Sequence, residues 1–372
     1  MRDALREAKQ RLACEIDSYS VPTSRLIAAD PWVVSSLLQK SIRRGETQIA
    51  QDAAFTFIKL NGAAIWRRLM VIAFEDVGVA NIDAITAVAA AGSDAALRKS
   101  CGGNTHVAIH LAGFLAASPK DRSADYLVGA KDHPALSDFA RTTRDASAEA
   151  KLLAVGDEAL SLPSKAIAAL LAAVRQGDAF GARAGLDRLL GAYRDLGVPE
   201  DLLAATEVAA SRTREPITVM VPLIWLAARD TKQEVRDWPV PPLVESDDVP
   251  LYALDQHTRM GREAIWRFAQ ENEAVRACLT QFVPENRWRS SAYVAAFHVD
   301  AAPIARRLVW DQSEALETFG IERDLLFAGV PAEGIEPLLG VTQANLNHLN
   351  EFRRDVLARS KADLVAREVR HD

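Results

Sequence analysis

Apolar residues recur along most of the chain with the three-to-four-residue spacing of an amphipathic helix. Convincing runs of strict apolar and polar alternation, which would indicate half-buried strands, are missing. The pattern therefore predicts an all-α protein. The predicted helices cover residues 2–17, 31–44, 47–60, 63–77, 81–91, 104–117, 122–131, 164–176, 178–195, 199–212, 255–271, 273–282, 290–297, 300–319, 321–328 and 345–370.

Prolines and capping residues divide these helices into domains. Asp30-Pro31 is a helix start, because Asp30 can cap the first turn and proline is tolerated at the first helical position. Residues 236–250 hold four prolines and four acids and cannot continue a helix, so they are a predicted linker. Val330-Pro331 and Glu336-Pro337 predict a turn region. The predicted organisation is a helix and connector at 1–30, a helical domain at 31–235, the linker at 236–250 and a second helical domain at 251–372.

The chain has 372 residues, of which 49% are hydrophobic, and a net charge of −6. This composition is typical of a globular protein and excludes a disordered or collagen-like one. The longest uncharged apolar stretch, residues 217–228, has twelve residues and contains a proline, whereas a membrane-spanning helix needs about twenty. The N-terminus lacks the apolar centre of a secretory signal, so we expect a cytoplasmic protein. Cys14, Cys101 and Cys278 are odd in number and far apart, which argues against a disulfide framework or a zinc knuckle.

Standard catalytic and cofactor signatures are missing from the chain. It contains no Gly-Lys dipeptide, which excludes a Walker A loop, and no dinucleotide-binding glycine motif, nucleophile elbow, His-Glu-x-x-His or EF-hand loop. We therefore expect no cofactor and no metal, and a function that is not enzymatic.

One acid occupies an unexpected position on the predicted helix 63–77. At about 100° per residue, Asp76 falls in the middle of the stripe formed by Ile65, Leu69 and Ile72. A buried carboxylate needs a partner, and either a helix N-terminus or an arginine from another helix would serve. We predict that Glu75 and Asp76 are structural acids of the interior, with a catalytic acid as the alternative.

Basic residues cluster in the same region. Lys40 with Arg43-Arg44 and Arg67-Arg68 could form a stripe that contacts DNA phosphates or a protein partner. The alternative is that these cations are solvated or pair with nearby acids.

A second polar cluster follows the predicted linker. Asp255, His257 and Arg259 lie near a helix start, and His298 with Asp300 offers a further imidazole and carboxylate. If the two groups converge, they could bind a divalent metal or a phosphate as part of a hydrolase. The alternative is an ordinary helix start capped by Asp255.

Five blocks of sequence carry a resemblance to a known family: Leu37–Gly45, Trp66–Leu69, Ala73–Ala80, Val107–Leu111 and Ala116–Lys120. The strongest is Arg-Arg-Leu followed by Glu-Asp-Val-Gly. Together the blocks resemble the C-terminal region of the replication-associated recombination ATPases, the bacterial RarA or MgsA proteins and the eukaryotic Werner-helicase-interacting ATPase. The resemblance covers roughly residues 35–130.

The resemblance implies a helical module similar to the collar of clamp-loader subunits, which in that family holds subunits together as an oligomer beside a separate AAA+ motor. It places His106 and His110 on a packing helix, although their i, i+4 spacing would also suit a metal. The Walker A lysine of the motor is missing here. We therefore expect a homo-oligomeric scaffold or DNA-binding accessory factor in replication, recombination or repair, working with a separately encoded AAA+ ATPase, and not a membrane protein.

Overall fold

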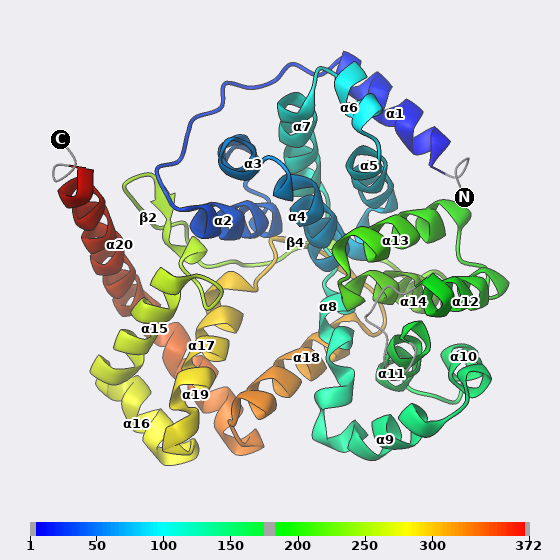
Figure 1. The fold of residues 1–372 in the computed structure, drawn as a ribbon. Helices are drawn as coiled ribbons and strands as arrows, with labels where there is room; N and C mark the ends of the chain where they lie inside the picture. The colour runs from blue at the N-terminus through cyan, green and yellow to red at the C-terminus, as the bar shows by residue number, and fades with distance from the viewer. Residues whose placement is uncertain (1–4, 175–182, 369–372) are drawn as a thin grey trace. The chain divides into compact units, whose positions relative to one another are not determined.

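The computed structural model describes residues 5–174 and 183–368, and the side chains among them except Arg183 and residues 361–368. These residues form the helices α1 to α20, four short strands and several single turns of 3-10 or π-helix (Figure 1). The prediction of an all-α protein is confirmed. The predicted helix segments at 2–4, 175–176, 178–182 and 369–370 lie outside the described residues.

Contacts between Cα atoms divide the chain into two compact units. Unit 1 comprises Met1–Arg25, Ser41–Trp238 and Ile304–Arg323, and unit 2 comprises Leu26–Lys40, Pro239–Pro303 and Asp324–Asp372. One division, after Trp238, falls inside the predicted linker at 236–250. The units are not contiguous in sequence as the predicted domains were, because hydrogen bonds tie the late segment 304–323 to unit 1.

Unit 1 is built mainly from helices joined by short turns. Its last segment, Ile304–Arg323, contains β4 and the first part of α18. This segment joins helices that come much earlier in the sequence. Its elements are α1 (Arg6–Asp17), the end of α2 (Pro31–Arg44), α3 (Thr47–Asn61), α4 (Ala64–Ile72), α5 (Ile82–Ser93), α6 (Ala95–Ser100), α7 (Asn104–Ala117), α8 (Ser123–Val128), α9 (Ser137–Asp145), α10 (Ala148–Gly156), α11 (Leu162–Ala173), α12 (Arg183–Asp195), α13 (Glu200–Thr213), α14 (Met220–Ala228), β1 (Glu234–Asp237), β4 (Arg306–Val309) and α18 (Ser313–Ala328).

Alanine is frequent in the core of unit 1. Helices α3 and α7 pack along each other, with Ala50, Ala53 and Ala54 of α3 and Ala108 and Ala112 of α7 fully buried. Alanine lets two helix axes approach closely, so this alanine-rich sequence buries backbone and short side chains where other cores use leucine.

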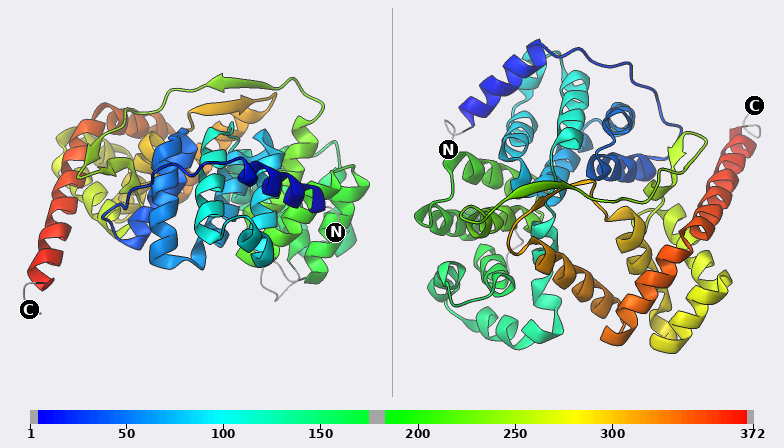
Figure 2. Two further views of the ribbon diagram at one scale, coloured as in Figure 1. Left: turned by 90° about the horizontal axis from the view of Figure 1, so that it is seen from above. Right: turned by 180° about the vertical axis from the view of Figure 1, so that it is seen from behind.

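A two-stranded ribbon runs across unit 1 (Figure 2). β1 pairs antiparallel with β4, with Val235 opposite Leu308. The other edge of β4 bonds to Lys120, whose N–H donates to Arg306 O at 2.7 Å and whose carbonyl accepts from Leu308 N at 2.8 Å. The prediction of a helix over 300–319 was therefore wrong at 306–309, because tertiary hydrogen bonds on both edges hold this segment extended.

Unit 2 is smaller and packs α15 against α17 and α20. It takes the first three turns of α2 and the last turns of α18, and a short antiparallel pairing joins β2 to β3. Its other elements are β2 (Glu245–Ser246), β3 (Val249–Pro250), α15 (Arg259–Glu271), α16 (Glu273–Phe282), α17 (Trp288–Ala296), the π-helical segment η8 (Phe297–Ala301), α19 (Ala332–Ala344) and α20 (Leu346–Glu368).

One predicted turn is a helix in unit 2. α19 contains Pro337 inside its second turn, where the sequence predicted a break between residues 330 and 337. The buried side chains Ile335 and Leu338 anchor this turn in the core. Packing therefore outweighs the hydrogen bond that proline cannot donate.

No single helix in the described part of the chain is long and apolar enough to cross a membrane, although α18 and α19, bent by 100° at their junction, together meet the criteria of length and composition.

Candidate functional site

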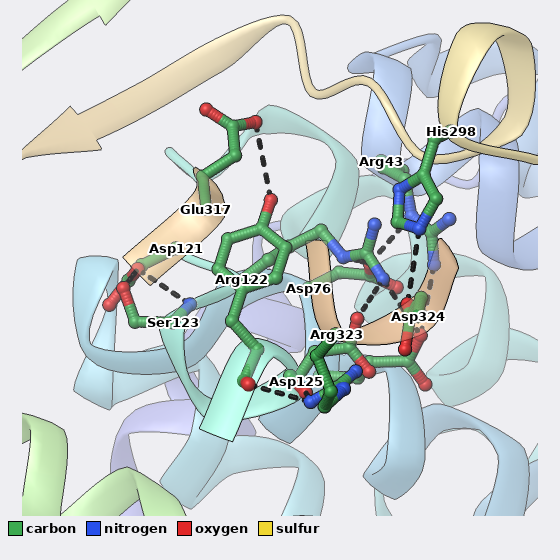
Figure 3. A network of polar contacts seen from close by, with 12 residues as sticks. Arg43, Asp76, Asp121, Arg122, Ser123, Asp125, His298, Glu317, Arg323 and Asp324 are labelled. Atoms are coloured by element: carbon green, nitrogen blue, oxygen red, sulfur yellow. Dashed lines mark hydrogen bonds and ion pairs between the residues drawn. The ribbon is translucent and has the colours of Figure 1, made fainter. Parts of the chain in front are cut away.

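A group of buried and partly buried charged side chains in unit 1, here called the ionic network, consists of Arg43, Glu75, Asp76, Arg122 and Asp125. Figure 3 shows Arg43, Asp76, Arg122 and Asp125. Arg43 Nε donates to Asp76 Oδ1 at 2.7 Å, and its Nη2 donates to Glu75 Oε1 at 3.0 Å. Arg43 is 1% exposed and Asp76 is fully buried. Charges at this depth are tolerated only with close partners of opposite sign, so the pair holds α2 to the end of α4.

Arg122 is the second cation of the ionic network. Its guanidinium pairs with Asp125, lies 3.4 Å from Asp76 Oδ1 and 3.6 Å from Glu75 Oε1, and lies near the ring of Tyr126, 5.8 Å from its centroid. Burial disfavours the charge on Arg122, but the surrounding acids outweigh it and raise its pKa. Arg122 is therefore a permanent cation within the interior.

A π-helical segment positions the acids. α4 passes directly into η1 (Ala73–Val77), and a π turn inserts a residue that re-aims the side chains after it. The segment ends at Gly78, whose φ is +52° and whose added Cβ would lie 2.4 Å from the carbonyl oxygen of Asp121. Only glycine fits this turn. In the Glu-Asp-Val-Gly sequence, backbone geometry therefore explains the glycine, and the ion pairs explain the two acids.

Three carboxylates face two guanidinium groups in the ionic network, so one negative charge is in excess. Burial raises the pKa of Glu75, and the neighbouring Asp76 and Asp125 raise it further against the opposing effect of Arg43 and Arg122. The folded state therefore disfavours the Glu75 carboxylate at neutral pH.

We expect Glu75→Gln to raise the free energy of unfolding by roughly 1 kcal/mol at pH 7, because it removes the excess charge and keeps an acceptor for Arg43. The folded protein binds the Glu75 proton more tightly than the unfolded chain does, so the native glutamate loses stability as pH rises from its usual pKa to its raised one. The difference in free energy of unfolding between Glu75→Gln and the wild type, measured by urea unfolding, should therefore be smaller below pH 4.5. A variant less stable than wild type at pH 7 would contradict this account.

Lys120 is a buried cation beside the ionic network. Its Nζ donates to the carbonyl oxygen of Ala116 at 3.0 Å and to that of Ser118, so it closes the C-terminal end of α7. It is 1% exposed. Burial lowers its pKa to about 7, with Asp76 opposing the shift and Arg306 adding to it.

The lowered pKa of Lys120 predicts a pH dependence of stability. Between pH 7 and about 10.4 the unfolded chain keeps a proton that the folded chain has released, so the free energy of unfolding should rise with pH. The slope is at most about 1.4 kcal/mol per pH unit. Urea unfolding at pH 7, 8 and 9 should show this rise in the wild type and in Lys99→Met, an exposed control, but not in Lys120→Met. Equal slopes in all three proteins would refute it.

The late segment of unit 1 extends these contacts. Arg307 pairs with Glu317, and the hydroxyl of Tyr126 donates to Glu317 Oε1 at 3.4 Å. Arg323 Nη1 donates to the carbonyl oxygen of Tyr126 at 2.6 Å. Residues 304–323 are thus bound to α8 by buried polar contacts as well as by the β1–β4 ribbon.

Most of the predicted basic stripe is not at the surface. Lys40, Arg43 and Arg44 are between 1% and 5% exposed, which corrects the expectation that they form a solvent-facing stripe for DNA phosphates. Arg67 is exposed and pairs with Glu215 Oε1 at 2.5 Å, and Arg68 is partly buried. The helical pattern placed these residues on helices. It could not show that Lys40, Arg43 and Arg44 form ion pairs with acidic side chains.

Both parts of the second predicted cluster lie in unit 2. Arg353 Nε donates to the carbonyl oxygen of Leu254 at 3.0 Å and its Nη1 lies 2.5 Å from Asp300 Oδ2, which joins the segments around Asp255 and Asp300. The ring of Phe297 has edge contacts with His257 and His298.

Each buried member of that cluster already has a partner. Asp255 Oδ2 lies 2.5 Å from Lys40 Nζ, and Lys40, aided by His257, keeps the pKa of Asp255 low against the effect of burial. His298 Nε2 lies 3.1 Å from Asp324 Oδ2. His257 and Arg259 are exposed. Within residues 5–174 and 183–368, no group of three or more His, Cys, Asp or Glu side chains is arranged to hold a metal ion.

No family model, curated protein or solved structure matches this chain.

Both units contain the same structural arrangement, which the sequence did not predict. η8 follows α17 as η1 follows α4, and in each segment the fourth residue is a buried aspartate paired with a buried arginine from a distant helix. The pairs are Arg43–Asp76 in unit 1 and Arg353–Asp300 in unit 2. Asp300 interrupts an apolar stretch, which is a signal for a buried acid, but Arg353 lies in a polar stretch 53 residues away, so the sequence did not identify it as the partner.

Proposed function

We propose that this chain is a non-catalytic, self-associating scaffold of the cytoplasm that works in DNA replication, recombination or repair, in contact with DNA or with a separate AAA+ ATPase. Its first helical region would act like the clamp-loader collar that the sequence resembles. The second unit would extend this scaffold.

One observation carries the proposal. In the blocks that carry the resemblance, Arg43, Glu75 and Asp76 form a contact between α2 and η1. Lys120 donates to carbonyl oxygens at the end of α7. Side chains used this way stabilise and specify an arrangement of helices, which is what a scaffold needs. The hydrolase alternative has less support, because Asp255 and Asp300 each already pair with a buried cation.

Mass in solution tests the self-association. We expect light scattering after gel filtration to give a multiple of the 40.5 kDa chain mass over a range of protein concentrations, with and without duplex DNA. Asp76→Leu should change the elution profile, whereas Asp138→Ala, which removes an exposed acid of α9, should not. A mass of one chain at every concentration in both conditions would overturn the proposal of a self-associating scaffold.

A fluorescence titration tests DNA contact separately. Binding should weaken by about 0.9 log units per log unit of salt for each phosphate neutralised, and Arg67→Glu should weaken it because Arg67 is the exposed cation of the predicted set. No binding at low salt, or binding independent of salt, would overturn direct DNA contact. Thermal stabilisation by a divalent metal that is lost in His257→Ala would instead support the hydrolase.

A further inference from the structure

A cleft in unit 1 brings two cysteine thiols to one surface. It lies between α1 and the loop that leads into α7, has a volume of about 520 Å³, and is lined by Cys14, Tyr19, Ser100, Cys101 and His106 among others. The ionic network uses none of these residues. The third thiol, Cys278, belongs to unit 2 and lies on α16.

The two thiols differ in accessibility. Cys14 is exposed on α1, whereas Cys101 is 7% exposed at the end of α6. A small oxidant in the cleft therefore meets Cys14 first, and Cys101 is shielded from bulk solvent. When an accessible thiol and a shielded one line the same cleft, the second can resolve a mixed disulfide formed on the first.

His106, which lines the same cleft as the two cysteines, can carry a proton. Nε2 of His106 is buried and makes no hydrogen bond within the part of the chain that the structure describes. Gly102 follows Cys101 with a φ of +83°, and a Cβ there would lie 3.0 Å from His106 Nδ1, so glycine lets the imidazole approach this loop. A nitrogen lone pair in this position can accept the proton that a thiol must lose to become a nucleophile.

We propose that this cleft is a thiol-oxidation site for low-molecular-weight disulfides such as oxidised glutathione. The Cys14 thiolate attacks one sulfur of the small disulfide, whose S–S bond breaks to give a mixed disulfide and one released thiolate. The Cys101 thiolate then attacks Cys14 Sγ and releases the second small thiolate. The two cysteine protons end on the two released thiols, with His106 as carrier. Two electrons pass from the cysteines to the small disulfide.

The protein disulfide would fasten α1 to unit 1. In the reduced protein the contacts of α1 include the ion pairs Lys9–Asp94 at 2.8 Å and Arg11–Asp83 at 2.7 Å, which are partly exposed and therefore weak, and the burial of Leu12 and Ile16. A covalent link from residue 14 to residue 101 closes a long loop and should raise the thermal midpoint of unfolding.

Peptide mapping of the full-length chain after treatment with oxidised glutathione tests the proposal. We expect a Cys14–Cys101 cross-linked peptide, a loss of two hydrogens from the intact mass, and a higher thermal midpoint that dithiothreitol reverses. Cys278→Ser should behave as the wild type. Cys101→Ser should stop at a glutathione adduct on Cys14 with no rise in the midpoint, and His106→Phe should slow the first step.

Two outcomes would overturn the proposal. One is a wild type that accumulates glutathione on Cys14 while Cys101 stays a free thiol. The other is a wild type whose two cysteines remain unmodified when Cys278 reacts. Both outcomes are independent of oligomeric mass and DNA binding, so they leave the proposed scaffold function untouched.

Discussion

Replacing Arg43 by methionine is expected to lower the free energy of unfolding of unit 1 by about 3–5 kcal/mol, because it leaves the fully buried Asp76 without its closest cation. Urea unfolding measures the loss. Hydrogen exchange should show increased opening in η1, which carries Glu75 and Asp76, and in α8, which carries Asp125 and follows Arg122. Arg67→Met is the matched control, since its exposed pair with Glu215 should contribute less than about 1 kcal/mol.

The double variant Arg43→Met with Asp76→Leu separates pairing from packing. Replacing both charges by apolar side chains removes the uncompensated carboxylate, so most of the lost stability should return. A double variant as unstable as Arg43→Met alone would show that the guanidinium acts mainly through its packing. An Arg43→Met protein as stable as the wild type would refute the assignment of the ionic network as a support of unit 1.

Replacing the buried arginine of unit 2, Arg353, by methionine should lower the free energy of unfolding by a similar amount. Arg353→Met breaks the contact with Asp300 at 2.5 Å and the hydrogen bond to the carbonyl oxygen of Leu254, and the expected loss is again about 3–5 kcal/mol. The neighbouring Arg354 is exposed, so Arg354→Met is a control that differs by one position in sequence. We expect it to unfold within about 0.5 kcal/mol of the wild type.

Hydrogen exchange can assign this loss to its unit. Increased exchange in Arg353→Met should appear in α15, α17 and η8, which pack in unit 2, before it appears in α3 or α7. Equal stability of the Arg353 and Arg354 variants would contradict the structural role of the Arg353–Asp300 pair.

Local signals in the sequence were sufficient to predict the boundaries of many helices. α2 begins at Pro31 and ends at Arg44, and α7 covers Asn104–Ala117, both as predicted. Asp30 accepts a hydrogen bond from the Trp32 N–H at 2.8 Å, as its capping position implied. Such boundaries depend on caps and prolines within a few residues, so they can be predicted without knowledge of the fold.

Elements that depend on distant partners were not predictable in the same way. β4 is extended because β1 and Lys120 supply hydrogen bonds on its two edges, and neither partner is near it in sequence. The late segment 304–323 joins unit 1 for the same reason. Composition at 236–250 indicated a break in the helices, but it could not indicate that the chain returns to the first unit afterwards.

The amino-acid sequence alone determined that the protein is helical and that Asp76, set among Ile65, Leu69 and Ile72, needs a positive partner. This follows from helical periodicity and from the cost of burying an isolated charge, which are both local properties. Only the tertiary structure decided that the partner is Arg43, and that Lys40, Arg43 and Arg44, three of the five cations expected at a DNA surface, lie inside the protein. Pairing between buried charges depends on which helices meet in space, and one-dimensional spacing does not encode that distance.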